Sequence, residues 1–196
     1  MIKQLYKLVL LFLTVLATTG FNSTFASDLE DKEIERETIT SWILGYNEKN
    51  VTPDKASRIV DYVHETAEQF SLSPSLLFAM MRTESGFKEA AKSSHGARGL
   101  MQVIPKYHRE KFAGRNPLDA AVSIEVGAWV LRDCMDKHRN NGRKSLNCYS
   151  GGGGKQYFDK INKVQKELQQ FILVAKSKPK QEPSDPIGVL IASLME

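Results

Sequence analysis

Glu84 is the residue whose setting in this sequence most favours acid–base chemistry. It follows the apolar run LLFAMM at 76–81 and precedes Ser85-Gly86, where a helix is expected to end. Desolvation by the apolar helix and the negative end of the helix dipole would both raise the pKa of its carboxyl group. A carboxyl that stays protonated near neutral pH can give a proton to a leaving oxygen. Taken alone, Glu84 is better interpreted as a solvated residue in the last turn of a helix. A catalytic role for it therefore has to be supported by other motifs in the sequence.

Cysteine and histidine, the other reactive side chains, are sparse. The histidines are scattered and no CxxC pair occurs, so we expect no metal site. Cys134 and Cys148 are the two cysteines. In an oxidising compartment such a pair is expected to be bridged, which would close a loop of about 15 residues and stabilise the fold by about 3 kcal/mol. The spacing alone does not show whether the two Cα atoms come close enough.

Apolar periodicity predicts helices throughout. Spacings of three and four predict an amphipathic helix over 55–70, and Ser73-Pro74 opens a buried helix that ends at Glu84. Asn116-Pro117 is expected to start another helix that reaches Met135, and a last long helix carries apolar positions from Tyr157 to Phe171. Sustained period-two alternation is absent. The predicted fold class is therefore all-α.

Four sequence motifs carry a resemblance. TESGF at 83–87, GARGLMQVIP at 96–105, NPLDAAVSIEVGAWVLRDCM at 116–135 and CYSGGGGKQYF at 148–158 follow one another in order. Together they resemble the soluble lytic transglycosylase (SLT) domain, whose helical core is shared with goose-type lysozyme. Gln102 stands eighteen residues after Glu84, and Tyr149 precedes the glycine run in an expected loop before the last helix, as the family pattern has it. The resemblance covers about residues 58–170 and implies a compact lysozyme-like domain.

The resemblance implies a role for each matching residue. Glu84 matches the catalytic acid and base, Ser93 a serine that contacts the sugar, and Tyr149 the tyrosine beside the glutamate. Met101 and Gln102 match residues that line the glycan groove, whereas Ser85 and Gly99 are expected to be structural. Ser150 departs from the pattern, because the family has asparagine there, and this puts the hydrogen bonding of the loop in doubt.

The family cleaves the β-1,4 bond between N-acetylmuramic acid and N-acetylglucosamine in peptidoglycan. The muramic 6-hydroxyl attacks its own anomeric carbon, so a 1,6-anhydro sugar forms without water or cofactor. Ordinary glycosidases need two carboxylates, but Glu89, Asp119 and Glu125 are better interpreted as solvated charges. The alternatives are a goose-type lysozyme hydrolase and a non-catalytic glycan-binding assembly factor.

The N-terminus has the pattern of an export signal. Lys3 and Lys7 precede an apolar run at 8–17, and Thr24-Phe25-Ala26 offers a cleavage site. We therefore expect a signal peptide at 1–26, with an uncleaved anchor as the alternative, and a periplasmic or cell-envelope location. The mature chain would have a helical or linker extension at 27–54, the SLT domain at 55–175 and a proline-containing tail at 176–196, with no transmembrane span.

The net charge of the chain limits the classes of partner that the sequence supports. The formal net charge of +4 falls to about +2 without the signal, which is too small to argue for nucleic acid and is compatible with an anionic wall polymer. The small domain and the CMDKH…NCYSGG segment look like the short specialised transglycosylases that accompany secretion, pilus or conjugation machines. The sequence does not name the machine.

Overall fold

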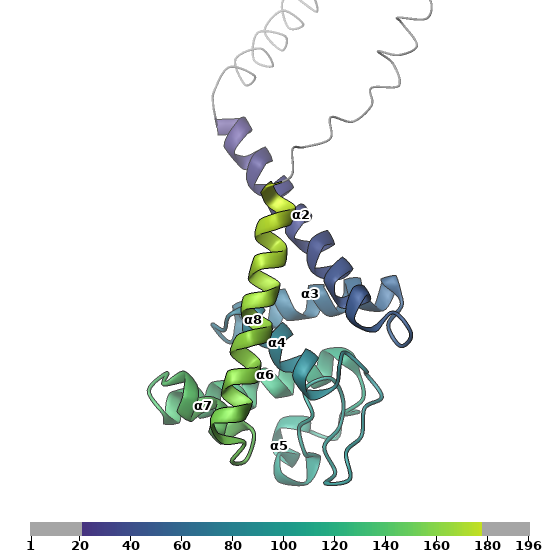
Figure 1. Cartoon of the computed structure of the whole chain (residues 1–196). Helices are drawn as coiled ribbons and strands as arrows, with labels where there is room; N and C mark the ends of the chain where they lie inside the picture. Colours follow the sequence, from purple (N-terminus) through teal and green to yellow (C-terminus); the bar gives the residue numbers. More distant parts are fainter. Residues whose placement is uncertain (1–20, 178–196) are drawn as a thin grey trace, which may run out of the picture.

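The computed structural model of the protein describes residues 21–177, and these residues form helices joined by turns and loops (Figure 1). The helices are α2 (Phe21–Asn47), α3 (Pro53–Gln69), α4 (Pro74–Glu84), the 3-10 helix η1 (Pro105–Tyr107), α5 (Arg109–Phe112), α6 (Ala120–Lys137), α7 (Gly142–Tyr149) and α8 (Gly154–Ser177). Within 21–177 there is no named strand, and extended pairing is limited to the isolated bridges Lys92–Arg98 and Arg98–Val103. The prediction of an all-α fold is confirmed.

The helix starts follow local side-chain chemistry. The Thr52 side chain accepts a hydrogen bond from the Lys55 amide, and a proline occupies the first helical position of both α3 and α4. The prediction that Asn116-Pro117 begins α6 is wrong by a few residues. Asn116 instead makes a turn by accepting from the Leu118 amide, and the Asp119 carboxylate caps α6 by accepting from the Val122 amide at 3.0 Å. A charged cap also suits the positive end of the helix dipole.

The buried centre of the fold is α4, as its composition predicts. Its residues 77–81 are all buried, and it packs against α3 and α8. Because an eleven-residue helix with no polar face cannot lie on a surface without exposing apolar area, the neighbouring helices must surround it. This packing places Glu84, the last residue of α4, at the edge of the core.

Part of the expected extension at 27–54 packs into the core of the domain. Ile39, Trp42 and Ile43 of α2 are buried in the same cluster as α3, α4 and α8. At the other end, α8 continues to Ser177, so the first two residues of the expected tail are helical. There Lys176 pairs with Glu35 of α2 at 2.6 Å, where the two helices meet in Figure 1.

Two further expectations fall largely outside the described residues: the signal peptide and the tail beyond Ser177. The expected cleavage point after Ala26 lies within the first turns of α2. Among the described residues, none of the helices combines the length and apolar character needed to cross a bilayer.

Candidate active site

Glu84 is half-buried at the C-terminal end of α4, and burial raises the pKa of its carboxyl group. The hydroxyl of Tyr157 and the charge of Lys160 oppose this effect, since both favour the carboxylate. Desolvation is the largest of these influences. The carboxyl group is therefore biased toward its protonated form, as required of a general acid.

Tyr157 is a site residue that sequence reasoning missed. Its hydroxyl donates a hydrogen bond of 2.5 Å to Oε1 of Glu84. Spacing alone assigned it to the apolar face of the last helix, together with Ile161 and Val164, and that face does pack on α4. Burial, followed by the negative charge of Glu84, raises the pKa of Tyr157, so the hydroxyl remains a neutral donor. The sequence feature that could have indicated a role for Tyr157 in the site is its position three residues after the glycine run.

Tyr149 supports the site through the backbone of Met101. The prediction of a loop here is wrong, because Tyr149 is the last residue of the short helix α7, which the Asn141 side chain caps. Its hydroxyl donates to the carbonyl oxygen of Met101 at 2.7 Å and not to Glu84. Burial raises the pKa of Tyr149 well above its usual range, and the charge of Glu84 adds to this effect. Tyr149 therefore holds the segment that carries Gln102.

Met101 was expected to line the glycan groove, but its side chain lies in the core. Its side chain is fully buried and lies across α6 at Gly127, where an added Cβ would come within 2.4 Å of the Met101 Cβ. Its amide donates to Oγ of Ser123 at 3.1 Å. Met101 therefore does not present its side chain on an open groove. It anchors the loop to α6, while its carbonyl receives Tyr149.

Gln102 is half-buried and has a left-handed backbone, with φ of 49°. Its Nε2 donates to the carbonyl of Gly99 at 2.9 Å and to that of Ala91 at 3.3 Å, so the amide nitrogen closes the loop internally. Gly99 itself has φ of 75° and a Cβ there would lie 2.3 Å from the Pro117 carbonyl oxygen. Only glycine fits that position.

Ser93 and Ser85 both make local hydrogen bonds. Oγ of Ser93 accepts from the Ala97 amide at 3.0 Å, which leaves the hydroxyl hydrogen able to donate to another group. Oγ of Ser85 donates to the Met81 carbonyl at 3.1 Å and so orders the end of α4. The resemblance implied a structural role for Ser85, and this hydrogen bond is a contact of that kind.

The turn after Glu84 is held by α2. Phe87 is buried despite a left-handed φ of 63°, which is costly for a bulky residue. Its ring meets Trp42 and Tyr46 edge-on, at centroid distances of 5.7 and 6.2 Å. Asn47 donates to the Gly86 carbonyl at 2.5 Å. The position of Glu84 thus depends on a helix that the motifs do not include.

A disulfide joins Cys134 of α6 to Cys148 of α7, with the Cα atoms 5.8 Å apart. Cys148 directly precedes Tyr149, so the bond fixes the end of α7 from which the tyrosine projects. The short α7 buries only Ser145 and Leu146, and the covalent link adds to this small packed area.

The other candidate carboxylates have partners of their own. Glu89 faces Lys55 at 3.5 Å, Asp119 caps α6, and Glu125 receives two hydrogen bonds from Arg115 at 2.6 and 3.1 Å. No contact between any of them and Glu84 is present in the described structure. The site therefore offers one carboxyl group, with two tyrosines near it.

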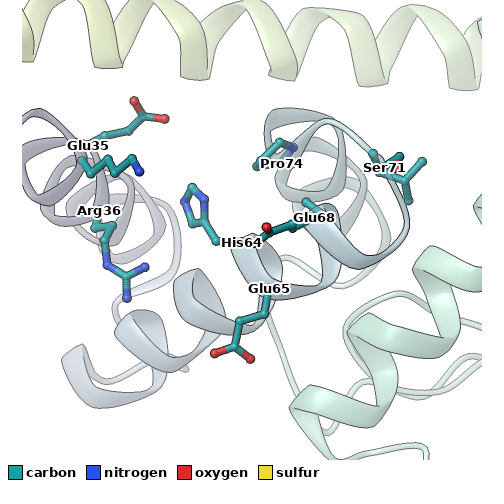
Figure 2. A pocket seen from close by; sticks show the side chains of 10 residues that line it. Glu35, Arg36, His64, Glu65, Glu68, Ser71 and Pro74 are labelled. Carbon is teal, nitrogen blue, oxygen red and sulfur yellow. The ribbon is translucent and has the colours of Figure 1, made fainter. Parts of the chain in front are cut away.

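A cavity of about 750 Å³ lies away from these residues, between α2, α3 and the start of α4 (Figure 2). Its lining includes Glu35, Arg36 and His64, and burial is the main cause that lowers the pKa of His64. Glu35 pairs with Lys176 and Arg36 with Asp61. Because none of the motif residues lines this cavity, we do not assign the chemistry to it.

The sequence matches the Transglycosylase SLT domain family over residues 61–172, more than half of the chain, and the chain belongs to that family. This confirms the resemblance drawn from the four motifs, and the helices described above agree with the expectation of a helical domain. Helix α2, which supports the turn after Glu84, precedes the matched residues.

Curated relatives agree with this assignment. Membrane-bound lytic murein transglycosylase C of Haemophilus influenzae is 30% identical over 117 residues, which cover 51% of this chain and 33% of that protein. The transglycosylase of Enterobacteria phage PRD1 is 32% identical over 84 residues, covering 43% and 31%. A solved inactive mutant of lytic transglycosylase Slt from Pseudomonas aeruginosa is 23% identical, covers 57% of this chain and 22% of that one, and superposes with a TM-score of 0.44. The chain spans about a third of the length of the curated relatives or less.

Proposed function

We propose that the protein is a peptidoglycan lytic transglycosylase that uses Glu84 as its catalytic acid and base. The observation that carries the proposal is the half-buried Glu84 carboxyl, whose pKa is raised by burial and which accepts the 2.5 Å hydrogen bond of Tyr157. Among the residues that the structure describes, no second carboxylate is recorded in contact with it. Membership of the SLT family and relatives named lytic murein transglycosylases support the same activity.

The reaction requires two proton transfers at one carboxyl group. Glu84 first donates its proton to the glycosidic oxygen while the bond from that oxygen to the muramic anomeric carbon breaks. The resulting carboxylate then accepts the proton of the muramic 6-hydroxyl as the 6-oxygen bonds to the same carbon. Water is neither consumed nor released, and Glu84 ends protonated. One residue with a raised pKa and a neutral hydrogen-bond donor is sufficient for this cycle.

The products separate this proposal from hydrolysis. Purified protein acting on peptidoglycan is expected to release 1,6-anhydromuropeptides, which mass spectrometry detects as one water lighter than hydrolysed fragments. Hydrolysed ends would instead identify a goose-type lysozyme activity. A folded protein that binds glycan and releases nothing would identify a non-catalytic factor.

We further propose that the protein acts outside the cytoplasm, opening the wall locally for a secretion, pilus or conjugation machine. The signal-like sequence at 1–26 and the disulfide support export, since structural disulfides persist in oxidising compartments. N-terminal sequencing of exported protein is expected to give a start near Ser27. Recovery of Met1 from that fraction would contradict cleavage.

A further inference from the structure

The segment that carries both site tyrosines is strongly basic. Between Asp136 and Asp159 the sequence has no acidic residue, and it contains five Lys or Arg side chains and one histidine. The cationic positions are Lys137, Arg139, Arg143, Lys144 and Lys155. A stretch of this kind creates a local positive potential even though the net charge of the whole chain is small.

Part of this charge surrounds a cavity. A space of about 300 Å³ lies where the end of α6, α7 and the start of α8 meet, and α7 lies beside that end of α8 in Figure 1. None of the residues that line it is acidic: His138, Arg143, Lys144, Asn147, Cys148, Gly154 and Lys155. Lys155 pairs with Asp159, and the Arg143 guanidinium lies 5.2 Å from the Phe158 ring centre. Lys144 has no ion pair within the described structure.

The cavity is closely connected to the site. Cys148, in its lining, directly precedes Tyr149, which supports the Met101 carbonyl. Gly154, also in the lining, starts α8 three residues before Tyr157, which binds Glu84. The cavity therefore adjoins, along the chain, the two elements that bring Tyr149 and Tyr157 to the site.

We propose that the cavity binds the carboxylates of the peptide attached to the muramic acid at the cleavage site. This inference rests on the proposed function. Muramic acid carries its stem peptide through a lactyl ether, and that peptide has free carboxylates near the sugar. Arginine binds a carboxylate in a bidentate manner, and lysine adds a mobile charge, so Arg143 and Lys144, which both line the cavity, match this ligand. The enzyme would thus favour glycan that still bears peptides.

The test compares two substrates. Glycan strands with intact stem peptides and the same strands stripped by an amidase are digested, and release of anhydro ends is measured at low and high salt. The variant is Arg143→Glu with Lys144→Glu, and Arg143→Gln with Lys144→Gln repeats the test without reversing charge. The control variant is Lys49→Glu with Arg58→Glu. It replaces two exposed residues outside this cavity and changes the net charge of the protein by the same amount.

The α7 variants are expected to lose about tenfold in kcat/KM on peptide-bearing strands, mainly through KM and mostly at low salt. Stripped strands should be cleaved at the wild-type rate, and the control pair should behave as wild type on both. Free stem tripeptide should inhibit the wild type more than inorganic phosphate does. Equal losses on both substrates, no loss on either, or equal inhibition by phosphate would overturn the inference. A wild type that cleaves neither strand would instead refute the proposed function.

Discussion

The hydroxyl of Tyr157 donates a 2.5 Å hydrogen bond to Oε1 of Glu84, across 73 positions of sequence. The bond joins the end of α4 to the first turn of α8, two helices that pack against each other. It stabilises the carboxylate, whereas burial stabilises the acid. Two opposing influences at one carboxyl group suit the proposed role, in which Glu84 first gives and then accepts a proton.

Replacing Glu84 by Gln removes the titratable proton and keeps nearly the same volume. We expect activity to fall by at least about 10²–10⁴-fold, because in the proposed mechanism this one residue performs both proton transfers. Glu89→Gln, which changes a half-exposed pair with Lys55, is the matched control and should have a mild effect. Release of 1,6-anhydromuropeptides measures activity, and circular dichroism checks folding. Wild-type release by a folded Glu84→Gln protein would refute the assignment.

Tyr157→Phe tests how the pKa of Glu84 is set. The hydroxyl lowers this pKa against the effect of burial, so its removal should raise the pKa further. The acid form then persists to higher pH, and the alkaline limb of the kcat/KM profile moves upward. Activity at the optimum should fall about tenfold, because the carboxylate loses a charge-assisted bond. Tyr107→Phe, at a side chain that is 67% exposed, should leave the profile unchanged. An unshifted limb in Tyr157→Phe would contradict this account.

Removing the disulfide with Cys134→Ser and Cys148→Ser should lower the free energy of unfolding by about 3 kcal/mol, mainly because the unfolded chain gains freedom. Denaturant unfolding of the oxidised wild type and the double variant measures this difference. Activity should also fall, because the bond fixes the end of α7 that bears Tyr149. Two free thiols in exported, unreduced wild-type protein would show that the bond is absent.

Trp42→Ala should lower the free energy of unfolding by about 3–5 kcal/mol, because the ring is buried against Phe87. Activity should decline as well, at a temperature where the variant is still folded, since the turn after Glu84 loses its support. Leu29→Ala on the same helix removes a side chain that is 52% exposed and should change stability by less than about 0.5 kcal/mol. If the Trp42 variant keeps full activity per folded molecule, α2 is not needed to position Glu84.

The sequence by itself determined the helical class, the buried α4 with Glu84 at its end, and the family. These depend on local information: apolar spacing, proline and glycine punctuation, and short motifs. The start of α6 and the helical state of Tyr149 were misjudged, because a single cap such as Asp119 or Asn141 decides them and α7 buries too few residues to show a period.

Only the tertiary structure decided which tyrosine binds Glu84. The periodic pattern of α8 shows that Tyr157 lies on the inward face of the helix, but it does not show which group its hydroxyl contacts. It also decided that the Met101 side chain lies in the core, since this depends on the absence of a Cβ at Gly127 on another helix. The role of α2 in supporting the site was likewise decided only by the tertiary structure. Trp42 and Asn47 hold the turn at Gly86 and Phe87 from about forty residues away, and contacts over such separations leave no periodic signal in the sequence.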